Sequence, residues 1–494
     1  MLIRHKLTSF FEADAYLKVL TAVVTFLLLD PQPVLLPLLD EVLAARSTSQ
    51  AGRQTEAADH YATASAWQPW DRSLQLQAGL AELAASRFEA SRRHFLTLAA
   101  LQGYNPVLHI LLGDAYSGLS DQTTAILQWE AALHELQSQK LTPTQTQSDP
   151  VLLEAAQKRL ADGYLALERW DEAAPMLAGL VVRHPDDAGS LYRLALITTA
   201  REPAAALPLL AFLTEISPQH APDAASLAGA IEGALHQESQ AYSYGVAGLY
   251  LLQLHEPSLA ATAFRQAIVL EGNYAEAHAY LGLALEQQGQ DGLPAFQAAV
   301  ELAPESPLVH SLLGMYWRSA GHADRALSEL ETAFRLDPLN SAAAAELGAT
   351  NVDLGSYETA EAWFLQAAEL SPQDENFWIL LAGFYADNEI DVRSSGLSAA
   401  LHALAANPQS AAAYDVLGHL LFLNGSLTGA RNMLSRALAL QPDLASAHYH
   451  LGLLHAAQDH PREARAEFGL ALQSDPGGHY GSLASRALAA LSPQ

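Results

Sequence analysis

The sequence predicts an all-helical protein built as an array of repeated helix pairs. Alanine and leucine supply much of the hydrophobic half of the chain, and both residues have a high helix propensity. From about residue 60, apolar residues recur at spacings of three and four, and Gly, Asp, Asn or Pro separates the apolar blocks. A chain of 494 residues rarely folds around a single core, so several domains or a repeat array are expected.

The first 46 residues differ from the rest and carry an apolar segment. Three cations, Arg4, Lys6 and Lys18, precede an apolar run from Val19 to Leu29, and a second apolar stretch reaches Leu39. Eleven helical residues rise only about 16 Å, which is short of the roughly 30 Å hydrocarbon core of a bilayer. A span read through residues 15–39 is long enough, but it places Asp30 near its middle.

Two interpretations of this N-terminal segment follow. The first is a membrane helix or export signal within residues 1–46, which would make the protein membrane-anchored or exported. The second is an apolar helix that caps the domain behind it, in which case a cytoplasmic location is expected. An unpaired apolar N-terminal run has to be buried somewhere, which favours the anchor.

An outline of spaced residues recurs along the chain. The stretches 311–338 and 345–372 share few residues, yet both keep L-G-x(6)-G-x(4)-A-x(3)-[LF]-x(2)-A-x(4)-P. The prolines that close successive outlines are spaced 34, 36, 34 and 34 residues apart. They are Pro338, Pro372, Pro408, Pro442 and Pro476. A fixed period of this length indicates a solenoid of repeated units.

This pattern resembles the tetratricopeptide repeat (TPR), whose unit is 34 residues of helix, turn and helix. The resemblance implies a right-handed α-solenoid of about eleven units between residues 60 and 478. Gly314 in the first helix of a unit would let the neighbouring helix approach closely, and Leu330 would fill the space between the two helices. Pro338 would end the second helix. One such pair cannot bury its apolar face alone, so successive pairs are expected to stack.

The units suggest a division of the chain after the N-terminal segment. Degenerate units occupy residues 47–216, with a polar Thr, Gln and Pro-rich loop from Ser138 to Pro150. An insertion or hinge is expected at 217–241, where the outline is poorly matched. Better units occupy 242–478, although the unit at 375–410 carries two additional residues and has Gly396 in place of the usual alanine. An amphipathic capping helix is expected within 479–494.

The sequence argues against a catalytic or cofactor-dependent function. None of the four lysines follows a glycine, so the chain has no P-loop, and neither HExxH nor G-x-S-x-G occurs. The absence of cysteine excludes disulfides, thiolate metal ligands and cysteine nucleophiles. The repeats leave no stretch long enough for a catalytic domain. We therefore expect no enzyme activity and no cofactor.

Histidines and tryptophans need separate interpretation. Four histidines lie within thirteen residues: His448, His450, His455 and His460. Their spacing lacks the i, i+4 pair that chelates well on a helix, so we expect no metal site. The tryptophans of the repeats, Trp129, Trp170, Trp317, Trp363 and Trp378, are expected to pack between helices.

The resemblance also implies a binding surface. In this family, positions 2, 5, 9, 12 and 13 of the first helices face a concave groove. In the five units of residues 307–478 these positions are Leu308, Ser311, Met315, Arg318 and Ser319; Ala342, Ala345, Ala349, Val352 and Asp353; Asn376, Ile379, Gly383, Ala386 and Asp387; Ala412, Asp415, His419, Phe422 and Leu423; and Ser446, Tyr449, Leu453, Ala456 and Ala457. Most of these residues are small or apolar, and a few carry carboxylates.

The composition restricts the partner. The net charge is -28, and no lysine follows Lys158, so neither nucleic acid nor a basic-patch contact with anionic lipid is expected. A lysine-based clamp for a terminal carboxylate is not expected either. The small apolar lining favours an apolar or helical segment of a partner protein.

The resulting hypothesis is a non-catalytic scaffold that binds protein partners through its groove, tethered by its N-terminus to a bacterial-type membrane. The alternative is a self-assembling structural subunit of a larger complex, in which the superhelices associate with one another.

Overall fold

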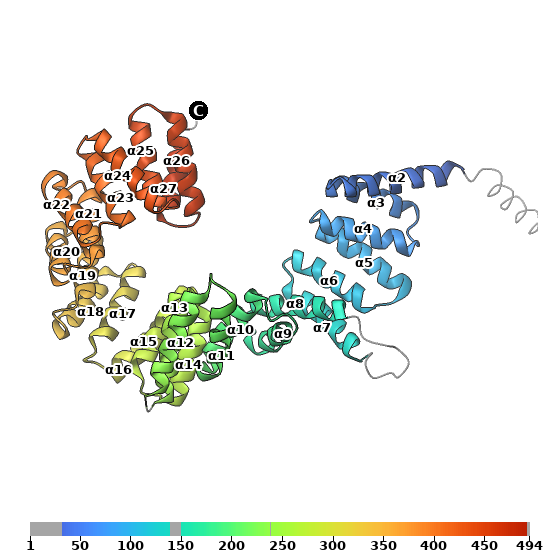
Figure 1. The fold of residues 1–494 in the computed structure, drawn as a ribbon, viewed down its shortest axis with the longest axis horizontal. Helices are drawn as coiled ribbons and strands as arrows, with labels where there is room; N and C mark the ends of the chain where they lie inside the picture. Colours follow the sequence, from blue (N-terminus) through green and yellow to red (C-terminus); the bar gives the residue numbers. More distant parts are fainter. Residues whose placement is uncertain (1–31, 139–149, 238, 492–494) are drawn as a thin grey trace, which may run out of the picture. The chain divides into compact units, whose positions relative to one another are not determined.

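The computed structural model describes residues 32–138, 150–237 and 239–491, and these ranges contain helices and no strand. The chain divides into two compact units, Met1–Gly229 and Ala230–Gln494 (Figure 1). The helices begin with α2 (Gln32–Gln50), α3 (Gln54–Trp67), α4 (Arg72–Ala84), α5 (Phe88–Gln102), α6 (Pro106–Gly118), α7 (Gln122–Ser138), α8 (Pro150–Ala166), α9 (Trp170–Arg183), α10 (Ala188–Arg201), α11 (Pro203–Ile216) and α12 (Ala221–Leu235).

The second unit holds the remaining helices. They are α13 (Gln240–Gln253), α14 (Pro257–Leu270), α15 (Ala275–Gln287), α16 (Leu293–Leu302), α17 (Pro307–Ser319), α18 (Ala323–Leu336), α19 (Ser341–Asp353), α20 (Tyr357–Leu370), α21 (Glu375–Asp387), the π-helical turn η2 (Val392–Gly396), α22 (Leu397–Ala406), α23 (Ala411–Leu423), α24 (Leu427–Leu440), α25 (Ala445–Ala457), α26 (Pro461–Ser474) and α27 (His479–Ala490).

Consecutive helices pack as pairs, which confirms the predicted solenoid. The described residues form eleven such pairs from α4/α5 to α25/α26, and in chain order α12 comes between the pair α10/α11 and the pair α13/α14. One further pair, α2 and α3, precedes them and packs against α4. The sequence did not predict this pair because α3 is rich in Ala, Ser and Thr and has little amphipathic contrast.

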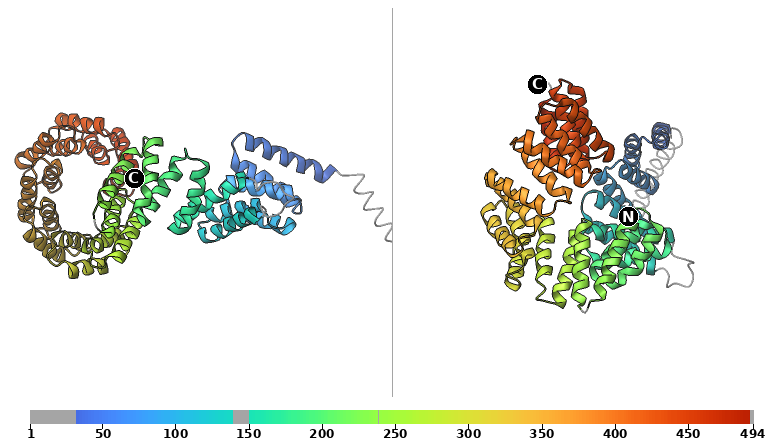
Figure 2. Two further views of the ribbon diagram at one scale, coloured as in Figure 1. Left: turned by 60° about the horizontal axis from the view of Figure 1, so that its bottom comes forward. Right: turned by 60° about the vertical axis from the view of Figure 1, so that its left-hand side comes forward.

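The second unit has an inner side formed by its first helices. Successive first helices, from α13 and α15 through α25 and α27, contact one another directly. Successive second helices, such as α18 and α20, make few or no contacts in the described part of this unit. A stack closer on one side than on the other must curve toward the closer side, and Figure 2 shows the curved path of these helices. The first helices therefore line the concave side.

In several pairs, a glycine of the first helix and a large residue sixteen positions later bring the two helices close together, as predicted. A Cβ atom added at Gly314 would lie 2.6 Å from Cγ of Leu330, and one at Gly348 would lie 2.8 Å from Cδ1 of Phe364. The same separation of sixteen residues joins Gly452 to Phe468. Each glycine accepts the large side chain of the second helix against its backbone, so the two helices pack without a gap.

The turns between the two helices of a pair require a left-handed residue. Gly321, Gly355 and Gly425 occupy this position with φ of 76°, 72° and 81°. Elsewhere the same turn uses a residue with a side chain, such as His255 at φ 58° or Asp459 at φ 60°. A side chain in this conformation costs roughly 1 kcal/mol or more compared with glycine.

We expect His255→Gly to raise the free energy of unfolding by about 1 kcal/mol, because glycine adopts this turn without strain. The reverse change, Gly321→Ala, should lower it by a similar amount, since open space surrounds its Cβ position and only the backbone conformation is penalised. Guanidinium unfolding of the full chain measures both changes. Equal effects of the same sign for both variants would contradict this explanation.

The two additional residues of the unit at 375–410 form the π-helical turn η2. Asp391, at φ 33°, begins this turn, and its carboxylate accepts hydrogen bonds from the backbone N–H and the hydroxyl of Ser395 at 3.3 and 2.6 Å. A Cβ atom at Gly396 would lie 2.9 Å from Leu420 Cδ2. The wider turn absorbs the insertion, and glycine replaces alanine because α23 packs closely there.

A ring at the fourth position of several first helices joins successive units. His448 hydrogen-bonds through Nδ1 to Glu467 at 2.7 Å and through Nε2 to the carbonyl of Pro442 at 2.9 Å. His310 makes the same two bonds, to Glu329 at 2.7 Å and to Pro304 at 2.9 Å. Because a carbonyl oxygen can only accept, Nε2 of each ring donates. These buried histidines thus satisfy the proline carbonyls that follow the preceding helices.

The N-terminal predictions fall largely outside the described residues. Residues 1–31 contain most of the predicted membrane segment 15–39, and residues 139–149 contain most of the predicted polar loop; both lie outside the described ranges. The described part of the segment belongs to α2, which includes Pro37 and packs against α3. Within the described ranges, no helix is both long enough and apolar enough to cross a membrane. The anchor stays a prediction.

Candidate binding cavity

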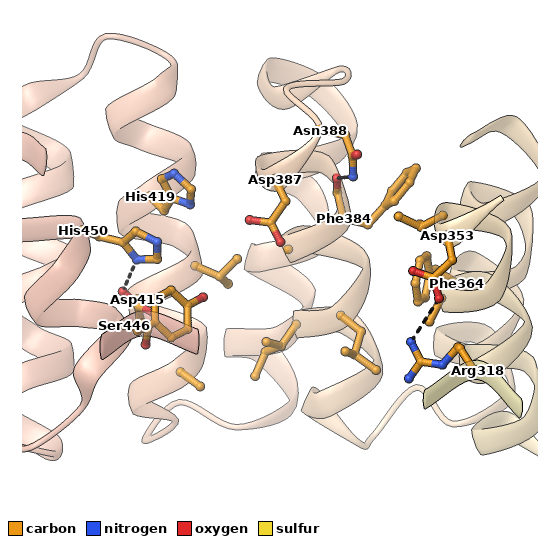
Figure 3. A pocket seen from close by; sticks show the side chains of 18 residues that line it. Arg318, Asp353, Phe364, Phe384, Asp387, Asn388, Asp415, His419, Ser446 and His450 are labelled. Atoms are coloured by element: carbon orange, nitrogen blue, oxygen red, sulfur yellow. Dashed lines mark hydrogen bonds and ion pairs between the residues drawn. The ribbon is translucent and has the colours of Figure 1, made fainter. Parts of the chain in front are cut away.

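The inner side of the second unit contains a cavity of about 490 Å³. Its walls come from the first helices α17, α19, α21, α23 and α25, with contributions from α20 and α27. The wall residues are Arg318, Ala349, Val352, Asp353, Phe364, Ile379, Leu380, Gly383, Phe384, Asp387, Asn388, Ala412, Asp415, Val416, His419, Ser446, His450 and Tyr480 (Figure 3). This volume is within the range of cavities that bind small molecules or side chains of a partner.

One end of the cavity carries charged side chains that form ion pairs with one another. Nε of Arg318, on α17, lies 3.2 Å from a carboxylate oxygen of Glu346, and Nη1 of Arg318 lies 3.7 Å from Oδ2 of Asp353. Both carboxylates come from α19, so the guanidinium bridges two neighbouring first helices. Figure 3 shows Arg318 and Asp353 at this end, next to Phe364. The cation is already neutralised by its neighbours.

The opposite end holds a buried Asp–His pair. Nδ1 of His450, on α25, lies 2.8 Å from Oδ1 of Asp415, on α23, and each residue is only 5% exposed. The ring of His419 stacks on His450, with centroids 4.0 Å apart, and the ring of Tyr480 meets His450 edge-on at 5.6 Å. The hydrogen bond compensates both buried groups, and the aromatic neighbours fix the plane of the His450 ring.

Burial shifts the pKa values of the groups at this end. It lowers the pKa of His419 to about 3, with a further decrease from the nearby His450, so His419 is neutral at pH 7. Burial raises the pKa of Asp387 above its ordinary value, although His450 and His479 partly oppose the shift. Asp387 is nevertheless exposed to solvent. It lies in the wall of an open cavity, with protein around it but without a cover.

The cavity brings together about half of the predicted groove residues. Seven of the predicted positions with larger side chains line it: Arg318, Val352, Asp353, Ile379, Asp387, Asp415 and His419. The small residues Ala349, Gly383, Ala412 and Ser446 line it as well. Leu308, Ser311 and Met315 instead line two further hollows of about 600 and 330 Å³ beside α17, together with Ala342 and Ser319.

The remaining predicted residues lie elsewhere. The Asn376 amide donates a hydrogen bond to Asp374 at 2.9 Å and so belongs to the start of α21. Phe422 packs against the core around Leu434, and Leu423 packs against the core around Leu420. Tyr449, Leu453 and Ala456 pack against Phe468 and Ala484. Ala345 and Ala386 are buried. Changes at Leu423 or Tyr449 would therefore test packing as much as binding.

Several cavity residues were not among the predicted groove positions. Leu380, Val416 and His450 each directly follow the fifth residue of a first helix, so this sixth position could have been included from the register. Phe364 and Phe384 fill the walls between helices. Tyr480 comes from α27, outside the repeats, and no repeat rule could have indicated it.

The histidine cluster of the sequence separates in the structure. His450 pairs with Asp415, His448 bonds to Glu467, and the rings of His455 and His460 lie 6.2 Å apart. Among the described residues, no group of three His, Asp or Glu side chains is arranged to hold a metal ion. Of the tryptophans, Trp129 is buried, and its indole N–H donates to Asp114 at 3.2 Å.

Fold and cavity together define the class of protein: an α-solenoid of stacked helix pairs with a concave inner face. A tetratricopeptide repeat model matches residues 158–221, 246–307 and 311–375, and a TPR repeat model matches residues 418–459. The chain belongs to the tetratricopeptide repeat family.

Alignment with three solved structures gives low sequence identity and TM-scores below 0.5. Yeast Tom70 is 15% identical, with 92% of this chain and 95% of that chain covered and a TM-score of 0.42. The APC/C hetero-tetramer Cut9–Hcn1 is 14% identical, with 91% and 95% covered and a TM-score of 0.43. A TPR protein from Thermus thermophilus is 23% identical, with 38% and 98% covered and a TM-score of 0.33. No curated protein matches the sequence.

Proposed function

We propose that this protein is a non-catalytic scaffold that binds a segment of a partner protein in the cavity on the inner side of its second unit. The observation that carries the proposal is the cavity itself, which first helices of five successive pairs build in common. Its apolar walls include Val352, Ile379 and Val416, while polar groups lie at both ends. This arrangement suits a segment that buries apolar side chains and is oriented by a few polar contacts.

The Asp415–His450 pair supports a binding role more than a catalytic one. Ser446 lies one helical turn before His450 on α25, so the three residue types of a hydrolase triad are near one another. Among the described residues, His450 is hydrogen-bonded to Asp415 and not to the Ser446 hydroxyl, whereas a serine nucleophile is activated by a hydrogen bond to such a base. The pair instead fixes the wall of the cavity.

A photo-crosslinking experiment in the cells that produce the protein tests this proposal. Benzoylphenylalanine replaces Leu380, which is 47% exposed and lines the cavity, or Leu401, which is 57% exposed on α22 of the same helix pair. We expect position 380 to crosslink to a partner protein and position 401 to give no such product. Gly383→Trp should abolish the crosslink, since open space surrounds the Cβ position at this cavity residue and the indole would enter the cavity.

Other outcomes would overturn the proposal. Equal crosslinking from both positions, or none from position 380, would remove the cavity as the binding surface. A product consisting of two copies of this chain would support the self-assembling structural subunit instead. Tethering through the N-terminal segment is part of the same hypothesis, and recovery of the crosslinked protein in the membrane fraction would support it.

A further inference from the structure

The polar end of the cavity has several hydrogen-bonding groups without a partner. Ser446 is only 9% exposed and lines the cavity, yet its hydroxyl forms no hydrogen bond within the described residues. The exposed Asp387 carboxylate and the half-buried Tyr480 hydroxyl also line the cavity and form no hydrogen bond within the described residues. These groups line the cavity with hydrogen-bonding capacity that the described residues leave unused, so a ligand that enters the cavity can bond to them.

These groups come from four helices and converge on one place. Asp387 is on α21, Asp415 on α23, Ser446 on α25 and Tyr480 on α27. Figure 3 shows Asp387 extending toward His419 and His450 across the space between α21 and α23. The His450 Nδ1 atom already bonds Asp415 at 2.8 Å, and Nε2 of His450 has no hydrogen-bond partner among the described residues. This end of the cavity is therefore a preformed polar site. The buried hydrogen bond between Asp415 and His450 fixes the orientation of the His450 ring.

The site is rich in acceptors, and no lysine or arginine lines the cavity at this end. Asp387 and Asp415 contribute carboxylates, and the hydroxyls of Ser446 and Tyr480 can accept hydrogen bonds. His419 is neutral at pH 7 because burial depresses its pKa. The nearest arginine in the wall, Arg318, is at the opposite end and is paired with Glu346 and Asp353. A negatively charged ligand would therefore be repelled, and a cation that carries several N–H donors would be complementary.

Resting on the function proposed above, we propose that this end of the cavity binds the guanidinium group of an arginine side chain in the partner segment. Guanidinium offers five N–H donors in a plane and has no acceptor, so it can satisfy acceptors arriving from several helices at once. Its aliphatic stem would lie along the apolar wall formed by Ile379 and Val416. Asp387 supplies the charge that recognises it, because Asp415 already bonds His450.

Peptide selection on the purified full-length protein tests this inference. A phage-displayed library of random 12-residue peptides is selected on the wild type, on Asp387→Asn and on Glu369→Gln. Glu369 is an exposed carboxylate on α20 outside the cavity, so this control makes the same charge change elsewhere. We expect arginine to be enriched in peptides selected on the wild type and on Glu369→Gln, and not in those selected on Asp387→Asn.

The most enriched peptide is then synthesised with its arginine retained, or changed to lysine or glutamine, and its affinity is measured by fluorescence anisotropy. Glutamine should weaken binding to the wild type by at least tenfold, as expected for loss of a charge-assisted hydrogen-bonded pair. On Asp387→Asn the same change should alter affinity by less than threefold. Equal binding of the lysine and arginine peptides would overturn the assignment to guanidinium.

The outcomes separate this inference from the proposed function. Peptides that bind, lose binding on Gly383→Trp and carry no essential arginine would overturn the arginine site while supporting the cavity as a binding surface. Peptides whose binding is unaffected by Gly383→Trp would contradict both. The asparagine variant preserves the size of the side chain, and its circular dichroism and unfolding midpoint establish that any loss of affinity is not a loss of fold.

Discussion

Substituting Gly452 with alanine is expected to destabilise the last helix pair by about 2 kcal/mol, although alanine is normally the better helix former. The added Cβ atom would lie 2.6 Å from both Cδ1 and Cε1 of Phe468, which is 1% exposed. A buried ring has little room to retreat, so either the rotamer or the spacing of α25 and α26 must change.

A double-mutant cycle isolates the cause. Phe468→Ala alone should cost about 4 kcal/mol, the usual range for emptying a buried aromatic site. In that background Gly452→Ala should become stabilising by up to about 1 kcal/mol, because the clash is gone and only the helix preference remains. The repeat at α21 and α22 shows the same logic in the native chain, since Ala382 replaces the glycine and the buried Ala400 lies in the register of the large residue.

Guanidinium unfolding of the full chain measures these changes, with hydrogen exchange of α25 and α26 to locate them, because repeat arrays need not unfold in one step. Gly469→Ala is the matched control: this helical glycine has open space around its Cβ position, so the change should stabilise α26. A destabilising Gly452→Ala in the Phe468→Ala background would contradict the close-approach explanation.

The second large effect is expected at the buried pair of the cavity. Asp415→Ala should lower the free energy of unfolding by about 3 kcal/mol, because it leaves the buried His450 ring without the partner of its Nδ1 atom. Replacing His450 with phenylalanine should cost a similar amount, since a buried carboxylate then loses its donor. The buried position of both residues makes the loss large.

The double variant Asp415→Leu/His450→Phe should recover most of this stability, because apolar residues of similar size need no hydrogen bond. Unfolding measurements on both single variants and the double variant give the coupling energy. Additive losses, with the double variant the least stable, would show that the pair does not act as a unit. The double variant should also lose the crosslink at position 380. Loss of the crosslink in a variant that has recovered its stability would show that binding depends on the polar groups of the cavity wall and not on stability alone.

The sequence predicted the fold in detail because its determinants are local and repeated. Helix periodicity, the glycine at each close approach and the proline at the end of each unit are all within one 34-residue period. The structure confirms the helix pairs that these features predict from α4 onward. The helix α3 was not predicted because its apolar residues are not concentrated on one face. The resemblance to the repeat family also placed eleven residues of the cavity, because the register of the repeat assigns the inner face of each first helix.

Only the tertiary structure decided which inner residues form a cavity. Asp415 and His450 are 35 residues apart, and their hydrogen bond depends on how α23 and α25 stack. Phe422 and Tyr449 occupy predicted inner positions yet pack into the cores, while Tyr480 reaches the cavity from α27. The sequence by itself determined the repeated unit. The curvature of the stack decided where the inner face opens into a cavity. This curvature is the sum of small rotations between all neighbouring pairs, so no single repeat determines it.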